Sequence, residues 1–407
     1  MRLTLVTLVA VFASAANSAA QDKVTVYKGA RILPAGAAAI DGGVLIVQNG
    51  KIQSVGGAST PLPADASIVD CTGKTITPGL VDASFRGSNN TNDLNEQSDE
   101  VTPHLRVLDC LDPADPVFRA ARRGGVTSVH VMPGTRNVIA GLGCAVKTWG
   151  SDPAKMVLAR DTSLRIVMGS EPSLGNRAIR GGRVESMYYR RPTTRMGVVW
   201  EARKAFYDAK EDMTLNAPPS GSAPGREILK QVLQGKLTAY TTARSEQDIR
   251  TALRLAAEFG YQTVIDDAQD AHYVIGELAD AKVTVLLGAP SATAVSGTAG
   301  RDGADPRGAT AVLLARAGVP FVITTGSNPD ALDLVREAMF AARNGLLPER
   351  ALDAVTIEPA RLLGIDARVG SLAAGKDADF VIWSHHPLDP AALAETVCID
   401  GLEVQSQ

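Results

Sequence analysis

The chain of 407 residues is 45% hydrophobic and has a net charge of −3 at pH 7. This length suits either one large barrel with an accessory domain or two domains, and the hydrophobic content excludes a disordered protein. The small net charge of mixed sign argues against a nucleic-acid partner and against an anionic membrane surface.

The N-terminus has the pattern of a secretory signal peptide. Met1-Arg2 is a basic start, residues 3–16 are apolar, and residues 17–20 are mostly small, as at a cleavage site. The apolar stretch is shorter than the ~20 residues that cross a bilayer, and no later segment is long and apolar enough to do so. We therefore expect a Sec-type signal peptide over residues 1–20, no membrane span after its removal, and a periplasmic or secreted protein.

Four cysteines lie in the mature part of the chain, and none form a C-x-x-C pair, which excludes a zinc ribbon or a thioredoxin motif. In an oxidising compartment they allow three disulfide pairings, of which Cys110 with Cys144 is favoured. The alternative is four buried free thiols. The cysteines are Cys71, Cys110, Cys144 and Cys398.

Residues 24–76 predict a small antiparallel β unit. Its short strand-like segments are separated by glycines and by Asn49-Gly50, a dipeptide suited to the positive φ angles of a tight hairpin. The last forty residues return to strand character at residues 379–383 and 396–399. We expect them to join the N-terminal unit in one small domain.

After Thr77-Pro78-Gly79 the pattern changes to strands that alternate with helices, which favours parallel β/α units. Residues 126–132 predict one strand. Ser245 can cap a helix that ends before Gly260 and is followed by the strand 263–265. Repetition of such units predicts a (β/α) barrel, whose site lies where the strands run into the following loops.

Three stretches, in this order, resemble the amidohydrolase superfamily. Residues 70–82 contain Asp-x-x-Gly-Lys followed by Pro-Gly-Leu-Val-Asp, residues 356–364 are similar to the last barrel helix, and residues 370–381 are similar to the closing segment. Residues 124–134 and 192–197 resemble the imidazolonepropionase-like branch. Pattern and resemblance together predict an α/β protein with a TIM-like (β/α)8 barrel over residues 78–365. A small β-sandwich domain is expected from residues 21–77 and 366–407.

The resemblance also implies a metal site. Hydrolysis of a C–N bond near neutral pH needs a strong nucleophile, which a divalent ion such as zinc supplies by lowering the pKa of its bound water to about 7. The superfamily holds the ion with His-x-His after the first strand, further histidines after later strands, and an Asp after the last strand.

The positions aligned with these groups have changed. Ser84 and Arg86 stand where His-x-His is expected, Thr242 and Asp267 where the later histidines are expected, and Gly326 where the Asp is expected. We expect these five residues to converge at the C-terminal ends of the barrel strands.

The histidine count supports this interpretation without an alignment, because the chain has only five and no two are spaced i, i+2. His130 lies in a predicted strand, where a satisfied interior role is favoured over metal ligation. The histidines are His104, His130, His272, His385 and His386.

The sequence leaves two arrangements of charge open. In one, Asp82, Asp266 and Asp267 join Lys147, a candidate for the carboxylated lysine of some relatives, in a carboxylate site for Mg, Ca or Mn. In the other, Arg86 replaces the charge of the metal and pairs with Asp267.

The arginines leave further alternatives. If Arg86 and Arg244 are unpaired, they can bind a carboxylate or phosphate through bidentate hydrogen bonds. The alternative for Arg244 is a solvated position on a loop.

The sequence thus predicts an exported amidohydrolase-family protein that is metal-free, needs no cofactor, and is non-catalytic. It is expected to act as a binding or partner subunit, as a homo-oligomer or together with an active homologue, with a small anionic ligand. The alternative is a hydrolase of carbon–nitrogen (non-peptide) bonds, such as those of cyclic amides, that uses a divergent metal site.

Overall fold

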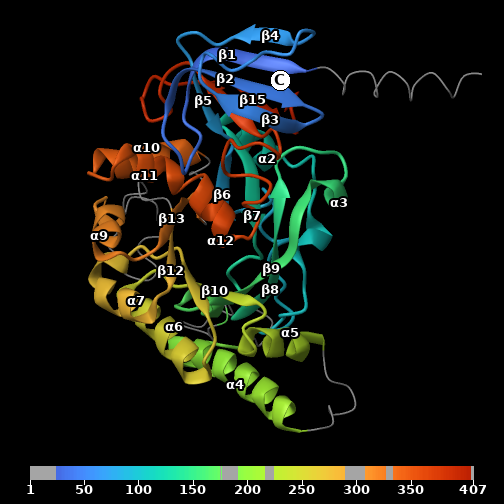
Figure 1. Cartoon of the computed structure of the whole chain (residues 1–407). Coiled ribbons are helices and arrows are strands. Elements are labelled where there is room, and N and C mark those ends of the chain that lie inside the picture. Colours follow the sequence, from blue (N-terminus) through green and yellow to red (C-terminus); the bar gives the residue numbers. More distant parts are fainter. Residues whose placement is uncertain are drawn as a thin grey trace, which may run out of the picture.

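The computed structural model describes residues 24–174, 176, 191–215, 224–288, 308–326 and 333–404. The predicted signal peptide lies outside these residues. Within the described ranges, no helix combines the length and apolar character needed to cross a membrane. Two sheets organise the described chain, one at the top of Figure 1 and one below it in the centre.

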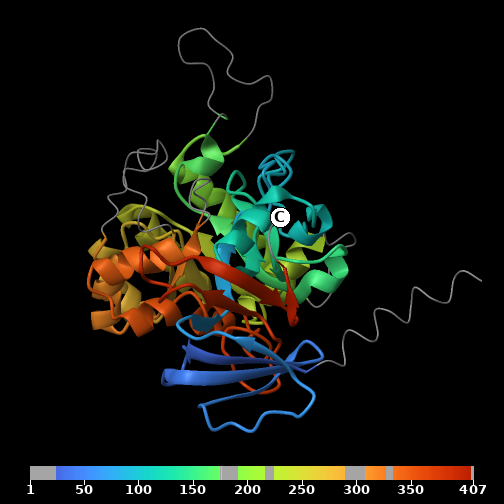
Figure 2. The same cartoon turned by 90° about the horizontal axis from the view of Figure 1, so that it is seen from above.

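Strands from both chain ends form the first sheet, which we call the terminal sheet. Figure 2 shows its N-terminal strands in blue beside the C-terminal strands in red. Its order is β16-β15-β14-β5-β1-β2-β3, with β4 also paired to β1. It is therefore one sheet, and the predicted β-sandwich is not confirmed. The strands are β1 (Thr25–Ile32), β2 (Ile40–Gln48), β3 (Lys51–Gly56), β4 (Ser67–Asp70), β5 (Thr75–Pro78), β14 (Phe380–Trp383), β15 (Ala394–Ile399) and β16 (Leu402–Glu403).

The hairpin between β2 and β3 forms where it was predicted. Asn49 and Gly50 have φ angles of 51° and 72°, the left-handed pair that joins two antiparallel strands through a two-residue turn. Alternate side chains then point into a separate apolar cluster of the terminal sheet, which includes Ile32, Leu45 and Phe380.

The second sheet, which we call the central sheet, has the order β13-β12-β11-β10-β9-β8-β7-β6. Its strands are parallel except β8, which runs antiparallel to both β7 and β9. The strands are β6 (Leu80–Phe85), β7 (Val126–Val131), β8 (Ile139–Lys147), β9 (Val157–Val167), β10 (Thr238–Thr242), β11 (Thr263–Asp266), β12 (Thr284–Gly288) and β13 (Phe321–Thr324).

The prediction of eight strand-then-helix repeats was wrong at β8, which enters the sheet as part of a hairpin. Among the described residues no ladder joins the edge strands β6 and β13. Residues 354–355 lie between them instead. The carbonyl of Ala354 accepts from Ile323 N at 3.0 Å, and that of Val355 accepts from Val81 N at 2.9 Å.

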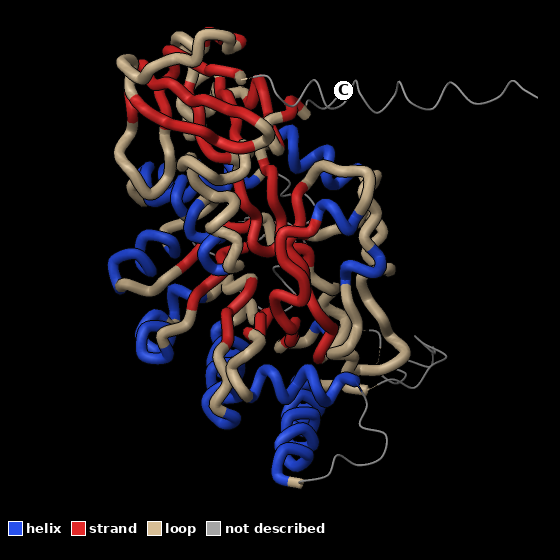
Figure 3. The backbone as a smooth tube through the Cα atoms, turned by 45° about the vertical axis from the view of Figure 1, so that its right-hand side comes forward, coloured by secondary structure: helices blue, strands red, loops and turns tan. Residues whose placement is uncertain are grey.

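Helices flank the central sheet (Figure 3). The predicted capped helix is α6, where Ser245 Oγ accepts from Asp248 N at 3.3 Å and Gly260 ends the helix with a φ of 73°. The helices are α2 (Pro116–Arg123), α3 (Pro153–Met156), α4 (Arg195–Thr214), α5 (Pro224–Leu233), α6 (Glu246–Phe259), α7 (Ile275–Ala281), α9 (Thr310–Ala317), α10 (Leu334–Arg343), α11 (Pro348–Asp353) and α12 (Ile357–Leu362), with 3₁₀ turns at Val107–Cys110, Glu171–Ser173 and Ala271–Tyr273.

All four cysteines are free thiols, without a bond between Cys110 and Cys144, but they are not all buried as the alternative arrangement had it. Cys110 is exposed, whereas Cys144, Cys71 and Cys398 are buried. Burial raises the pKa of the Cys144 thiol to about 12, which keeps it protonated and unreactive at neutral pH.

Lys147 joins the two sheets and does not belong to a metal site. Because β8 runs antiparallel, its last residue pairs with Ser128 near the start of β7, at the end of the central sheet that faces the terminal sheet. Lys147 Nζ lies 2.8 Å from Asp377, 3.0 Å from Asp379 and 2.7 Å from Asp400. The side chain of Lys147 is only 3% exposed, so this is a buried ionic contact.

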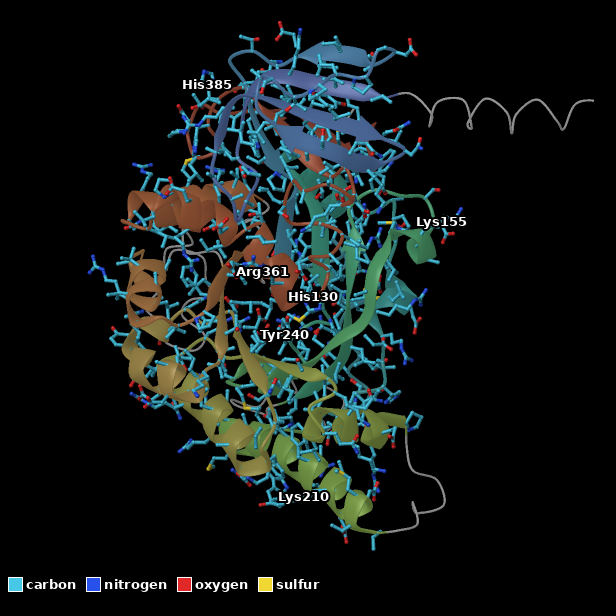
Figure 4. All side chains as sticks on the ribbon, viewed as in Figure 1. His130, Lys155, Lys210, Tyr240, Arg361 and His385 are labelled. Carbon is cyan, nitrogen blue, oxygen red and sulfur yellow. The ribbon has the colours of Figure 1, made fainter. Side chains whose placement is uncertain are left out.

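Replacing Lys147 by Met should lower the free energy of unfolding by about 3–5 kcal/mol, because it leaves the buried Asp379 carboxylate without its cation. Denaturant unfolding at neutral pH measures this. Lys155 on α3, exposed at the edge of the molecule in Figure 4, provides the matched control. Lys155→Met should change stability by less than about 0.5 kcal/mol. Equal effects of the two substitutions would contradict a structural role for Lys147.

Candidate functional site

The parallel register brings the C-terminal ends of the strands to one place. Thr242, the last residue of β10, is paired with Asp266, the last residue of β11. Gly288, at the end of β12, is paired with Thr324 at the end of β13. Residues that directly follow these strands therefore gather at this end of the central sheet, opposite the terminal sheet.

A cavity of about 210 Å³ opens at this end, beside β6 and β7. It contains three of the five predicted site residues, Ser84, Arg86 and Gly326. Thr242 and Asp267 approach it indirectly, each through an arginine that is described below. Among the side chains that line the cavity are Arg136, Arg165 and Glu171.

Arg165, on β9, is the cation at the centre of the site, and the sequence analysis missed it. Its side chain is buried, and its Nε and Nη2 donate to Thr242 Oγ1 at 3.1 and 2.9 Å. Nη2 also donates to Asp266 Oδ2 at 2.9 Å, and Nη1 donates to the carbonyl of Pro133 at 2.9 Å. Thr242 in turn donates to the same Asp266 oxygen at 2.9 Å. Arg165 therefore ties the end of β9 to the ends of β10 and β11.

Arg244 forms a second buried ionic group. Its Nε lies 2.6 Å from Asp267 and its Nη1 lies 2.5 Å from Glu171, which also accepts from Thr135 Oγ1 at 2.6 Å. Burial opposes the charge of Arg244, but the two carboxylates outweigh burial and raise its pKa. Burial likewise opposes the charge of Glu171, whose pKa nevertheless falls because of Arg244 and Thr135.

Two expectations about the arginines are corrected by these contacts. Asp267 pairs with Arg244 and not with Arg86, and Arg244 is not solvated on a loop. Arg86 is half-buried instead, and its Nε is buried without a hydrogen-bond partner in the described part of the chain.

Gly326 and Asp267 lie next to each other and both have left-handed backbones, with φ angles of 63° and 57°. A Cβ atom at Gly326 would lie 3.0 Å from Gly288 Cα and 3.7 Å from Asp267 Oδ1. An aspartate at position 326 would therefore be crowded against the backbone of Gly288, and its carboxylate would stand beside Asp267. The close approach explains the glycine at this position.

Asp82, on β6, connects the first and last strands of the central sheet. Its Oδ2 accepts from Thr325 N and Oγ1, and its Oδ1 accepts from Ser84 N at 3.1 Å. Burial raises the pKa of Asp82 to about 7 in spite of these hydrogen bonds. The carboxyl group is therefore close to half-protonated at neutral pH.

His130 has the satisfied interior role that was predicted for it. It lies in the middle of the molecule beside Tyr240, with 5.1 Å between the ring centroids (Figure 4). Its Nδ1 is 3.0 Å from the carbonyl of Ala83, and its Nε2 is 2.8 and 3.1 Å from the hydroxyls of Thr162 and Ser163. Burial lowers its pKa to about 4, so the imidazole is neutral at pH 7 and both nitrogens are occupied. His385 lies at the terminal sheet, far from the cavity (Figure 4).

The side chains at the strand ends do not fit a divalent ion. In the described ranges no three His, Cys, Asp or Glu side chains are grouped as metal ligands. A guanidinium lies against Asp266, and another lies against Asp267 and Glu171, so three of the four carboxyl groups already have a cation, while Asp82 accepts hydrogen bonds from Ser84 and Thr325. The chemistry of these donors is that of paired charges and not of an open coordination site.

Comparison with known proteins identifies the class. Residues 272–403 match the model of the amidohydrolase family. The structure superposes on that of an amidohydrolase from Thermotoga maritima MSB8 with a TM-score of 0.82 and 32% identity, over 93% of this chain and 99% of that one. The chain belongs to the amidohydrolase family.

Curated relatives give the same class. Amidohydrolase tasK of Hapsidospora irregularis is 28% identical over 88% of this chain. Imidazolonepropionase of Shewanella frigidimarina (strain NCIMB 400) is 44% identical over 17% of it, and supports the predicted imidazolonepropionase-like branch. The chain spans 39% of the length of the first relative and 18% of the second.

The shifted pKa values of Asp82 and His130 predict opposite effects of pH on stability. Asp82 binds a proton more tightly in the folded state, with a pKa of about 7 against 3.8, so it makes the free energy of unfolding fall as pH rises between these values. His130 binds a proton less tightly, with a pKa of about 4 against 6.5, so it makes stability rise over that window.

Substitution separates the two effects. Relative to the wild type, Asp82→Asn should gain stability as pH rises from 4 to 7, and His130→Gln should lose it from 4 to 6.5, each by up to ~1.4 kcal/mol per pH unit. Urea unfolding at several pH values measures both differences. If the difference in free energy of unfolding between each variant and the wild type stays constant with pH, the pKa values of Asp82 and His130 are not shifted by folding.

Proposed function

We propose that this chain is a metal-free, non-catalytic amidohydrolase-family protein that acts as a binding or partner subunit. The observation that carries the proposal is Arg165, whose guanidinium binds Asp266 and Thr242 where the family resemblance implies a metal. The cation bound to these two residues cannot activate water, because an arginine neither polarises a bound water as a metal does nor loses its proton at neutral pH.

The balance of charge supports the same conclusion. A buried carboxylate is costly unless a cation compensates it, and in a metalloenzyme the metal does this. Here Arg165 compensates Asp266, and Arg244 compensates Asp267 and Glu171. A divalent ion at this place would add positive charge next to two guanidinium groups.

A hydrolase of carbon–nitrogen bonds with a divergent site is the alternative. Four carboxyl groups gather at the strand ends, namely those of Asp82, Glu171, Asp266 and Asp267, and Asp266 Oδ1 has no hydrogen-bond partner in the described ranges. Such a site would require Arg165 to leave Asp266 before a metal could bind there.

The localisation, the scaffold and the assembly state of the protein are part of the same proposal. We propose export through the N-terminal signal peptide, and a scaffold in which residues 354–355 complete a barrel from the central sheet. A binding subunit of this kind fits a homo-oligomer or a complex with an active homologue.

Metal analysis after purification without chelators tests the proposal. We expect less than about 0.1 divalent ion per chain, and no change in thermal unfolding on addition of zinc or of a chelator, because a protein that binds no metal gains no stability from it. One ion per chain that is removed by the chelator, together with a chelator-sensitive amidase activity, would establish the alternative.

Replacing Arg165 by Met supplies the matched comparison. The substitution leaves one carboxylate and one hydroxyl, which are too few ligands for zinc, so neither this variant nor the wild type should bind zinc if the site has lost its metal ligands. Stoichiometric zinc binding by the variant or by the wild type would show that a ligand set for a metal remains at this position.

A further inference from the structure

We propose that the cavity at the strand ends binds a small carboxylic acid with an apolar body, and that Arg86 holds its carboxylate. The proposal rests on the proposed function, since it assigns to a metal-free site the class of ligand that it takes. It follows from three properties of the cavity, which are an unpartnered guanidinium, an excess of positive charge and an apolar wall.

The first property is the state of Arg86. This residue directly follows β6, lines the cavity and is half-buried. Its Nε is buried and has no hydrogen-bond partner among the described residues, and none of the ion pairs found there includes it. A buried donor without a partner costs free energy, so a group that accepts from this guanidinium is expected to occupy the cavity.

The second property is the charge inside the cavity. Arg165 and Glu171 also line it, but each is already compensated, by Asp266 and by Arg244 respectively. Arg86 and Arg136 remain, and in the described part of the chain neither forms an ion pair. The cavity therefore presents two uncompensated cations, and an anion is the ligand that this field favours.

The third property separates a carboxylic acid from other anions. The buried side chains of Phe85, Leu94 and Met132 line the same cavity and offer an apolar surface beside the arginines. A planar carboxylate matches the two parallel N–H groups of a guanidinium, and an apolar body packs against these three side chains. The volume of about 210 Å³ suits a small molecule.

Calorimetric titration of the full chain tests the proposal with a defined set of probes. Acetate, isovalerate and phenylacetate carry a carboxylate on bodies of increasing apolar size, while isovaleramide and phenylacetamide have the same bodies without the charge. We expect at least one of the two larger acids to bind more tightly than acetate, and its amide to show no binding. Inorganic phosphate is the competing anion and should bind more weakly than that acid.

Variants then assign the binding to Arg86. Arg86→Gln should weaken binding of the preferred acid by about 10- to 100-fold, as expected for loss of a charge-assisted pair, and Arg86→Lys by less. Arg316→Gln, at an exposed position of α9, is the control and should leave binding unchanged. Unfolding curves of each variant verify that the fold is retained, and Arg86→Lys keeps the test valid if Arg86→Gln does not fold.

The outcomes also distinguish this proposal from the proposed function. Binding by arginine persists in the presence of a chelator, whereas binding to a metal is lost with the metal. If no acid binds more tightly than its amide, if phosphate binds best, or if Arg86→Gln and Arg86→Lys bind like the wild type, the carboxylate proposal is wrong even when metal analysis finds none. If metal is present and chelation abolishes binding, the metal-free function fails as well.

Discussion

A guanidinium buried among the ends of parallel strands is the interaction on which the site depends. Arg165 has to be compensated because it is only 6% exposed, and its hydrogen bonds reach β10, β11 and the loop after β7. Removing either Arg165 or Asp266 alone would leave the other charge buried without a partner. We therefore expect Arg165 and Asp266 to be substituted together when such a site changes in evolution.

The two buried ionic groups lie at opposite ends of the central sheet and have different roles. At one end of the central sheet, Lys147 and three carboxylates attach the terminal sheet. At the other end, Arg165 and Arg244 attach strands to one another and form part of the cavity. Both groups use buried charges, and beside the second lies a cation, Arg86, without a counterion in the described ranges.

The sequence predicted the elements whose signals are local. Asn49-Gly50 gave a hairpin because few residue pairs accept two left-handed angles, and Ser245 with Gly260 bounded α6 for equally local reasons. Convergence of the strand ends follows from parallel pairing, and the structure brings Ser84, Arg86 and Gly326 to one cavity. The direction of β8 has no local signal, because an apolar strand reads the same in either orientation.

The errors at the site have different physical causes. Lys147 was placed near the site as a candidate for the carboxylated lysine of some relatives, and the antiparallel direction of β8 puts it at the opposite end of the sheet. Arg165 was missed although its position in the apolar run Ser163–Val167 is a usable signal, since a charge inside a buried strand needs a partner. Pairing of Arg244 with both Glu171 and Asp267 depends on contacts between distant segments, which no spacing along the chain reveals.

Because the terminal sheet combines strands from both chain ends, it cannot be completed until synthesis is nearly finished. β5 ends at Pro78, but β14, its partner on one side, begins only at Phe380. During synthesis the backbone of β5 on that side therefore stays without its strand until most of the central sheet has been translated. An unpaired edge is a template for association with other chains, so we expect this edge of β5 to be a site of misassembly until β14 has been synthesised and has paired with it.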